Sequence, residues 1–167
     1  MRPQDVPILL KIIAQKQSSW QNKDLAAELY ISSSEISESL NRSLIAGLIN
    51  TEKRNVHRQS LFEFIEYGLR YTFPAVPGSI VNGLPTAHSH PFLKQYFGAS
   101  SIYVWPDIQG ENRGQAIEPL FKNAVKAAIA DEYFYKLLAL VDVFRVGKTR
   151  EIKIAKEELK KAFVYES

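Results

Sequence analysis

The sequence contains no cysteine, which excludes disulfide bridges, thiolate zinc sites and cysteine nucleophiles and leaves histidine and carboxylate as metal ligands. Long apolar runs are also missing, because the longest, such as residues 137–141, are far shorter than the roughly 20 residues that span a bilayer. The first residues include a proline and an acid and lack the apolar core of a signal peptide. These absences predict a cytoplasmic protein in a reducing compartment, without a membrane partner.

The composition that remains is that of a globular protein. Of the 167 residues, 46% are hydrophobic and 23% are charged, which are proportions that allow the chain to fold on its own. This length fits one domain, or a small domain with a helical extension. The net charge of +3 permits nucleic-acid binding without requiring it, because the clustering of the charges decides the matter.

The spacing of apolar residues predicts a mainly α fold with a small β-hairpin. Residues 74–91 are rich in proline, glycine, serine and histidine and show no periodicity, a short strand is expected at 102–105, and residues 109–115 form another turn-rich loop. We therefore expect an N-terminal domain with a linker helix over 1–73, an irregular loop-rich connection over 74–117 and a helical region over 118–167 that would serve dimerisation or partner binding. The predicted helices cover about 5–16, 22–30, 33–46, 60–71, 118–130, 131–146 and 150–163, and the hairpin covers 48–59.

Capping signals mark several helix ends. Ser32 and Glu35 have the S-x-x-E spacing of a capping box at the start of the third helix, and Gly47 is placed to end it. A second S-x-x-E pattern begins at Ser60, and Asp131 is placed to cap the helix that follows it. These signals predict where the chain changes direction.

The segment from Leu25 to Ile49 has the pattern of a helix-turn-helix. Two short helices that cross steeply need apolar residues at their inward positions and a small residue at the crossing, which Ala26 or Ala27 supplies. The segment resembles, without gaps, the winged helix-turn-helix of bacterial regulators, the MarR-like and related families. The inward positions are Leu25, Ala26, Leu29, Ile31, Ile36 and Leu40.

This resemblance implies a transcriptional regulator that binds double-stranded DNA, with the third helix in the major groove and the hairpin as a basic wing. Serine and asparagine can reach base edges, arginine can bind guanine or phosphate, and the wing holds the densest basic cluster of the chain. A homodimer would strengthen the binding. The predicted DNA contacts are Ser33, Ser34, Ser37, Glu38, Asn41 and Arg42 on the helix and Lys53, Arg54, His57 and Arg58 on the wing.

One further motif has the spacing of a metal chelate. His88 and His90 form an H-x-H pattern, but it lies in a proline-flanked tract without a supporting carboxylate motif. We therefore expect this tract to pack against the winged domain and to hold no metal. No Ser/His/Asp grouping or carboxylate pair stands out, so we expect no enzyme and no cofactor.

Two alternatives remain open. The chain could be an antitoxin-like or adaptor protein whose C-terminal helices bind a protein partner, and a toxin gene beside it would favour this reading. The residues from Tyr133 to Leu140 are more typical of a core or dimer seam than of a ligand cage. A regulator that senses a ligand between the winged domain and residues 74–91 is the other alternative, and a ligand-induced shift in melting temperature would support it.

Overall fold

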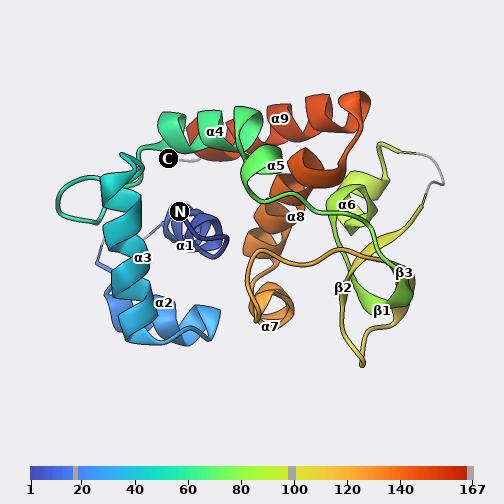
Figure 1. Cartoon of the computed structure of the whole chain (residues 1–167), viewed down its shortest axis with the longest axis horizontal. Coiled ribbons are helices and arrows are strands. Elements are labelled where there is room, and N and C mark those ends of the chain that lie inside the picture. The colour runs from blue at the N-terminus through green and yellow to red at the C-terminus, as the bar shows by residue number, and fades with distance from the viewer. Residues whose placement is uncertain (17–18, 98–100, 165–167) are drawn as a thin grey trace.

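The computed structural model describes residues 1–16, 19–97 and 101–164. Over these residues the chain is a mixed α/β protein, about 57% helical, with a small three-stranded sheet. None of the helices in these ranges combines the length and the apolar character needed to cross a bilayer. The elements in Figure 1 are α1 (Asp5–Ala14), α2 (Asn22–Leu29), α3 (Ser33–Ile45), α4 (Arg58–Tyr67), α5 (Leu69–Thr72), β1 (Ile80–Pro85), the 3-10 helix η1 (Ala87–Ser89), α6 (Pro91–Lys94), β2 (Tyr103–Pro106), β3 (Asn112–Ala116), α7 (Ala124–Ala130), α8 (Glu132–Val146) and α9 (Thr149–Val164).

The N-terminal part is built from α1, α2 and α3, close to the predicted ranges. Helix α1 is buried along Asp5–Ile13, because α2, α3 and α8 all pack against it. Helix α3 begins after Ser32, whose hydroxyl accepts a hydrogen bond from the backbone N–H of Glu35 at 3.2 Å. Gly47 follows the helix with a φ of 77°, a left-handed conformation that glycine adopts without a steric penalty. Both predicted ends of this helix are confirmed.

Helix α8 is the centre of the fold. It packs against α1, α4, α5, α7 and α9, and in Figure 1 α4 and α9 lie side by side along one end of it. Asp131 caps α8 as predicted, because its carboxylate accepts a hydrogen bond from the backbone N–H of Phe134 at 3.0 Å. Phe134, Leu137, Leu138 and Leu140 are buried in this core. The apolar run therefore stabilises the fold and is not exposed to a partner.

Residues 74–117, which we expected to be an irregular connection, contain the three strands of the sheet. Strand β1 pairs antiparallel with both β2 and β3, and β2 and β3 pair parallel, so the strands close on one another. Gly83 makes this possible, because a Cβ there would lie 2.0 Å from the carbonyl oxygen of Trp105. The sequence predicted β2 alone among the three strands.

Other element boundaries also differ from the prediction. The expected hairpin over 48–59 contains a single β-bridge, between Ile49 and Val56. Helix α4 begins at Arg58 and not at Ser60, because the backbone N–H of His57 completes the hairpin and the helix follows at once. Helix α7 begins at 124 and not at 118, because the backbone N–H of Ile117 still bonds to the carbonyl of Val104 in β2.

The tract that holds His88 and His90 packs against α8, where we had expected it to pack against the winged domain. The Nε2 atom of His88 lies 2.6 Å from the carbonyl oxygen of Ser101, and Nδ1 of His90 accepts a hydrogen bond from the backbone N–H of Phe92 at 3.1 Å. Each imidazole ring thus forms a hydrogen bond with a backbone group. In the part of the chain that the structure describes, no three His, Asp or Glu side chains gather as a metal site.

The burial of His90 makes the stability of the fold depend on pH. Burial, with a smaller contribution from the nearby Lys136 charge, lowers the pKa of His90 from 6.5 to about 4. Between these values the unfolded chain binds a proton that the folded chain does not, so the free energy of unfolding falls as the pH falls from about 6.5 to about 4. We expect a loss of at most about 3 kcal/mol in urea unfolding experiments, since one pKa unit corresponds to about 1.4 kcal/mol.

The matched control for this prediction is His90→Asn. Asparagine keeps a side-chain acceptor for the N–H of Phe92 but does not titrate. The variant should therefore lose less stability over the same pH range. Equal losses in the two proteins would show that His90 is not the titrating group.

Candidate nucleic-acid interface

Helices α2 and α3 follow one another after a short turn and pack against each other. Leu25 and Leu29 from α2 are fully buried, and Ile36 and Leu40 from α3 pack into the same core. Tyr30 takes a left-handed conformation in the turn, with φ 57° and ψ 40°. A residue with a side chain rarely adopts this conformation, so the packing on both sides holds the turn in place.

The outward face of α3 is polar and poor in charge. Ser33, Ser34, Ser37, Glu38 and Asn41 are all exposed, as the helical spacing predicted. Hydroxyl and amide groups of this length can bond to base edges, and the N-terminal backbone N–H groups of a helix can bond to phosphate. This face could therefore meet a DNA groove without rearrangement.

Arg42 is not part of that face. Its guanidinium binds the carboxylate of Asp5 on α1 with two nitrogens, Nη2 at 2.7 Å from one oxygen and Nε at 3.0 Å from the other. The same carboxylate accepts a hydrogen bond from the buried hydroxyl of Ser39 at 2.6 Å. Arg42, which we predicted to contact guanine or phosphate, thus fastens α3 to α1, and its side chain remains 22% exposed.

The charge state of Asp5 follows from these contacts. Its complete burial raises the pKa of the carboxyl, but the hydrogen bonds from Arg42, from Ser39 and from the backbone of Arg2 outweigh this effect. The pKa of Asp5 therefore lies below its ordinary value of 3.8, and the carboxylate is ionised at neutral pH. In turn, the hydrogen bond with Asp5 raises the pKa of Arg42.

Lys53 is the basic residue of the wing that lies against the polar face of α3. Its ammonium group donates a hydrogen bond to the side-chain carbonyl of Asn41. Lys53 itself has a φ of 56° and lies in a tight turn. The side-chain Oδ1 of Asn50 stabilises this turn by accepting hydrogen bonds from the backbone N–H groups of Arg54 and Asn55. The turn thus places the ammonium group of Lys53 beside the C-terminal half of α3.

The other predicted wing contacts are engaged within the protein. Arg54 lies 4.7 Å from the centre of the Trp20 ring and donates a hydrogen bond to the Trp20 carbonyl at 2.9 Å. Arg58 donates a hydrogen bond to the carbonyl of Phe163 at 3.0 Å, and Nδ1 of His57 lies 2.8 Å from the carbonyl of Gly47. Arg54 and His57 remain exposed and can still attract phosphate, whereas Arg58 faces α9.

Sequence reasoning missed the residues that organise this region. Asp5 is the first residue of α1 and binds a residue 37 positions away. Nothing in the local pattern indicated that Ser39 points inward or that the guanidinium of Arg54 lies over the ring of Trp20. The signal that could have suggested buried ion pairs is that Asp5 and Lys11 are the charged residues of a helix whose other side chains are apolar.

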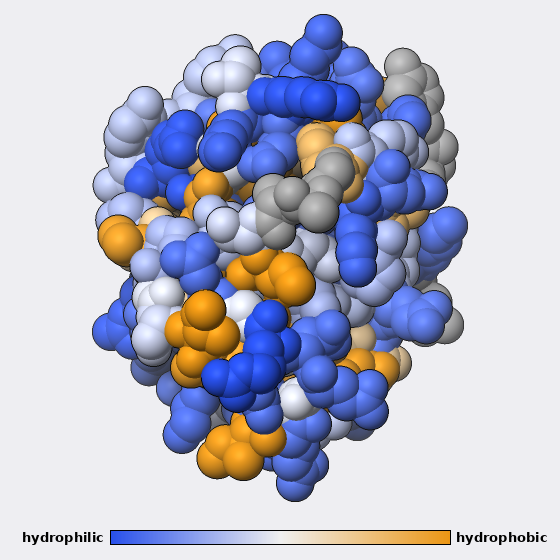
Figure 2. Space-filling model, turned by 90° about the vertical axis from the view of Figure 1, so that its right-hand side faces the viewer, coloured by the Kyte–Doolittle hydropathy of each residue, from blue (hydrophilic) through white to orange (hydrophobic). Residues whose placement is uncertain are grey.

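The side of the molecule that carries the sheet differs from the exposed face of α3. Figure 2 shows the side that carries the sheet, where apolar groups are separated by hydrophilic ones. The exposed apolar side chains of this region include Ile80, Ile102 and Ile108. Scattered apolar residues are normal on a protein surface, and a partner surface needs a continuous patch.

Comparison with known proteins adds no identification. The sequence matches no protein-family model and no curated protein, and the fold matches no solved structure. Any function must therefore be argued from the residues and geometry described above.

The Asp5 contact predicts a large effect of one substitution. Asp5→Ala removes the carboxylate and leaves the guanidinium of Arg42 and the hydroxyl of Ser39 without their acceptor, which should lower the free energy of unfolding by about 3–5 kcal/mol. Urea unfolding at neutral pH measures it. Glu157→Ala, at an exposed position on α9, is the control and should change stability by less than about 0.5 kcal/mol.

The same contact sets a pH dependence. Because the pKa of Asp5 is lowered in the folded chain, its contribution is present above 3.8 and is lost as the pH falls below that value. The stability difference between the original protein and Asp5→Ala should shrink in that acidic range. A difference that stays constant from neutral to acidic pH would contradict the assigned ion pair.

Proposed function

We propose that the protein is a cytoplasmic transcriptional regulator that binds double-stranded DNA as a homodimer, with α3 in the major groove. The observation that carries the proposal is the division of α3 into two faces. Ile36 and Leu40 are buried and Arg42 binds Asp5, whereas three serines, Glu38 and Asn41 remain exposed, as does Ile45 at the end of the helix. An exposed face of hydroxyl and amide groups on the second helix of such a pair is suited to reading base edges.

Electrostatics supports a modest affinity for each monomer. Lys53 stands beside Asn41, and Arg54 and His57 stay exposed on the same hairpin, so the wing can bind the phosphate backbone. Glu35 and Glu38 on α3 add negative charge, which can accept a hydrogen bond from cytosine but repels phosphate. Two copies binding two half-sites would compensate for this repulsion.

The prediction for DNA binding separates backbone contacts from base contacts. Lys53→Ala should weaken binding to all sequences alike and reduce the slope of log affinity against log salt concentration by about 1. Asn41→Ala should narrow the difference between the specific site and scrambled DNA by about 1–3 kcal/mol. A gel-shift titration at several salt concentrations, with the DNA upstream of the protein's own gene, measures both effects.

The control for Lys53→Ala is Lys160→Ala, because Lys160 is exposed on α9, away from the hairpin. This variant should keep the salt slope and the affinity of the original protein. If Lys53→Ala and Lys160→Ala behave alike at low salt, the hairpin does not touch DNA and the proposed mode of binding is wrong.

The homodimer has its own test. Tyr67 and Tyr71 are 68% and 80% exposed on α4 and α5, and Tyr67 borders a shallow groove lined also by Met1 and Phe64. Large exposed aromatic rings are enriched in interfaces. Sedimentation should find two chains in the original protein and one in the double variant Tyr67→Ser, Tyr71→Ser, whereas Tyr96→Ser, at another exposed tyrosine, should leave the dimer intact. A monomeric original protein would contradict the dimer.

A further inference from the structure

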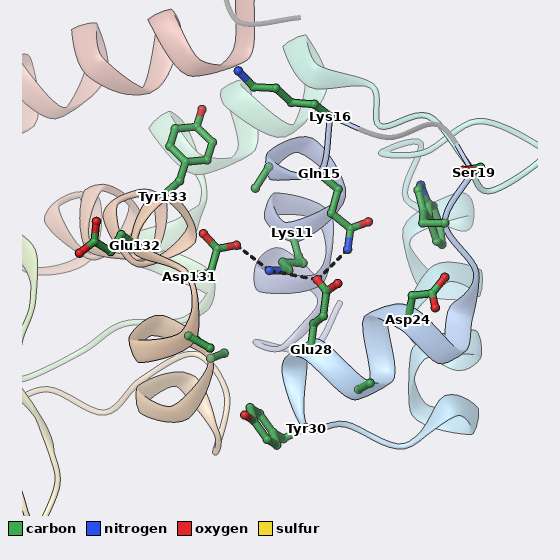
Figure 3. Close-up of a pocket in the computed structure, with 15 residues that line it drawn as sticks. Lys11, Gln15, Lys16, Ser19, Asp24, Glu28, Tyr30, Asp131, Glu132 and Tyr133 are labelled. Carbon is green, nitrogen blue, oxygen red and sulfur yellow. Dashed lines mark hydrogen bonds and ion pairs between the residues drawn. The ribbon is translucent and has the colours of Figure 1, made fainter.

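A cleft of about 1300 Å³ lies between the N-terminal helices and the corner where α7 meets α8. Helices α1 and α2 form one wall, and the end of α7 and the start of α8 form the other (Figure 3). This cleft differs from the place between the winged domain and residues 74–91 that the sequence left open for an effector. Its volume exceeds that of a drug-sized ligand, and its walls carry several groups whose bonding is specific.

At the bottom of the cleft, the ammonium group of the buried Lys11 contacts two carboxylates. The Nζ atom of Lys11, which is 5% exposed, lies 2.6 Å from the carboxylate of Asp131 and 3.1 Å from that of Glu28. Partial burial raises the pKa of Asp131, but the hydrogen bonds from Lys11 and from the backbone of Phe134 outweigh it, so the pKa lies below its ordinary value. One ammonium group therefore faces two carboxylates, and the group as a whole carries excess negative charge.

The side-chain oxygen of Gln15, at this cleft, accepts no hydrogen bond from the described residues. The amide nitrogen of Gln15 donates a hydrogen bond to Glu28 at 2.9 Å, which fixes the orientation of the amide, because the reverse orientation would set two oxygens against each other. In Figure 3 the amide nitrogen points toward Glu28 and the oxygen points away from it. That oxygen is buried and has no hydrogen-bond partner among the described residues. A buried carbonyl in this state favours any ligand that brings an N–H group.

The remaining lining residues decide the charge of that ligand. Two lysines line the cleft, Lys11 and Lys16, against four carboxylates that include Asp24 and Glu132. An anion would meet this surplus of negative charge, whereas a cation would balance it. Apolar lining is available for the rest of a ligand, from the ring of Tyr30 and from the alanines Ala14, Ala27, Ala127 and Ala130.

We propose that this cleft binds a small organic cation, a primary ammonium group attached to an aromatic or apolar body. The ammonium donates a hydrogen bond to the free oxygen of Gln15 and faces the carboxylate of Glu28, and the body lies against the alanines and Tyr30. The cation thereby donates a hydrogen bond to the buried oxygen of Gln15 and offsets the excess negative charge of the carboxylates. Neither role requires the protein to bind DNA.

The test is a calorimetric titration of the full chain, without DNA, with phenethylammonium chloride. We expect saturable binding with a Kd of about 1 mM or tighter, which a ligand of this size can reach. The neutral analogue 2-phenylethanol should bind at least about tenfold more weakly, because it lacks the charge. Equal binding of the two compounds, or no saturable binding of phenethylammonium, would overturn the proposal.

Two variants assign the site. Gln15→Met removes the free carbonyl, and Ala27→Phe fills the cleft from an exposed position on α2 where a larger side chain should not disturb the core. Each should weaken phenethylammonium binding by at least about tenfold. Gln59→Met, the same change at an exposed site on α4, should leave the affinity unchanged. Unchanged affinity in both cleft variants would overturn the assignment, and since no DNA is present the outcome does not depend on the proposed function.

Discussion

The carboxylate of Asp142, buried on α8, is the interaction on which the arrangement of the C-terminal half depends. One oxygen accepts hydrogen bonds from Thr86 and from the indole of Trp105, each at 2.7 Å, and the other accepts one from Arg145 at 2.9 Å. Arg145 in turn donates to the carbonyls of Phe73 and Glu118. A buried ion pair is tolerated only when such bonds satisfy it, so the sheet and both connecting segments must meet α8 at this point.

The N-terminal half uses the same device with a different consequence. Asp5 is buried on α1 and binds Arg42 and Ser39 of α3, so the orientation of α3 is set by its inward charge and not only by its apolar face. As a consequence, Arg42, the one arginine of α3, is bound to the carboxylate of Asp5. The outward face of α3 keeps hydroxyl and amide groups, and any strong attraction to phosphate must come from the neighbouring hairpin.

Local patterns in the sequence predicted the longer helices and the exposed face of α3, because helical periodicity, the Ser32 and Asp131 caps and Gly47 act within a few residues. They did not predict η1 and α6. They did not predict β1 and β3, whose short sequences include Gly83, Gly114 and Pro85 and are held by pairing with distant strands. The same limit applies to the candidate site. Whether an arginine is free or paired depends on contacts such as those of Arg42 with Asp5 and of Arg54 with Trp20, which lie more than thirty residues apart in sequence.

The buried ion pairs also change how the net charge should be judged. Arg42, Lys11 and Arg145 are bound by four carboxylates, those of Asp5, Asp131, Asp142 and the exposed Glu28. Together these groups carry a net negative charge, so the groups outside them are more positive than the net charge of +3 suggests. A basic surplus outside these ion pairs favours association with a polyanion, while the acidic excess within the Lys11 cleft favours a cation. The chain therefore favours an anion at one place and a cation at another, because the fold pairs some of its charges and leaves others unpaired.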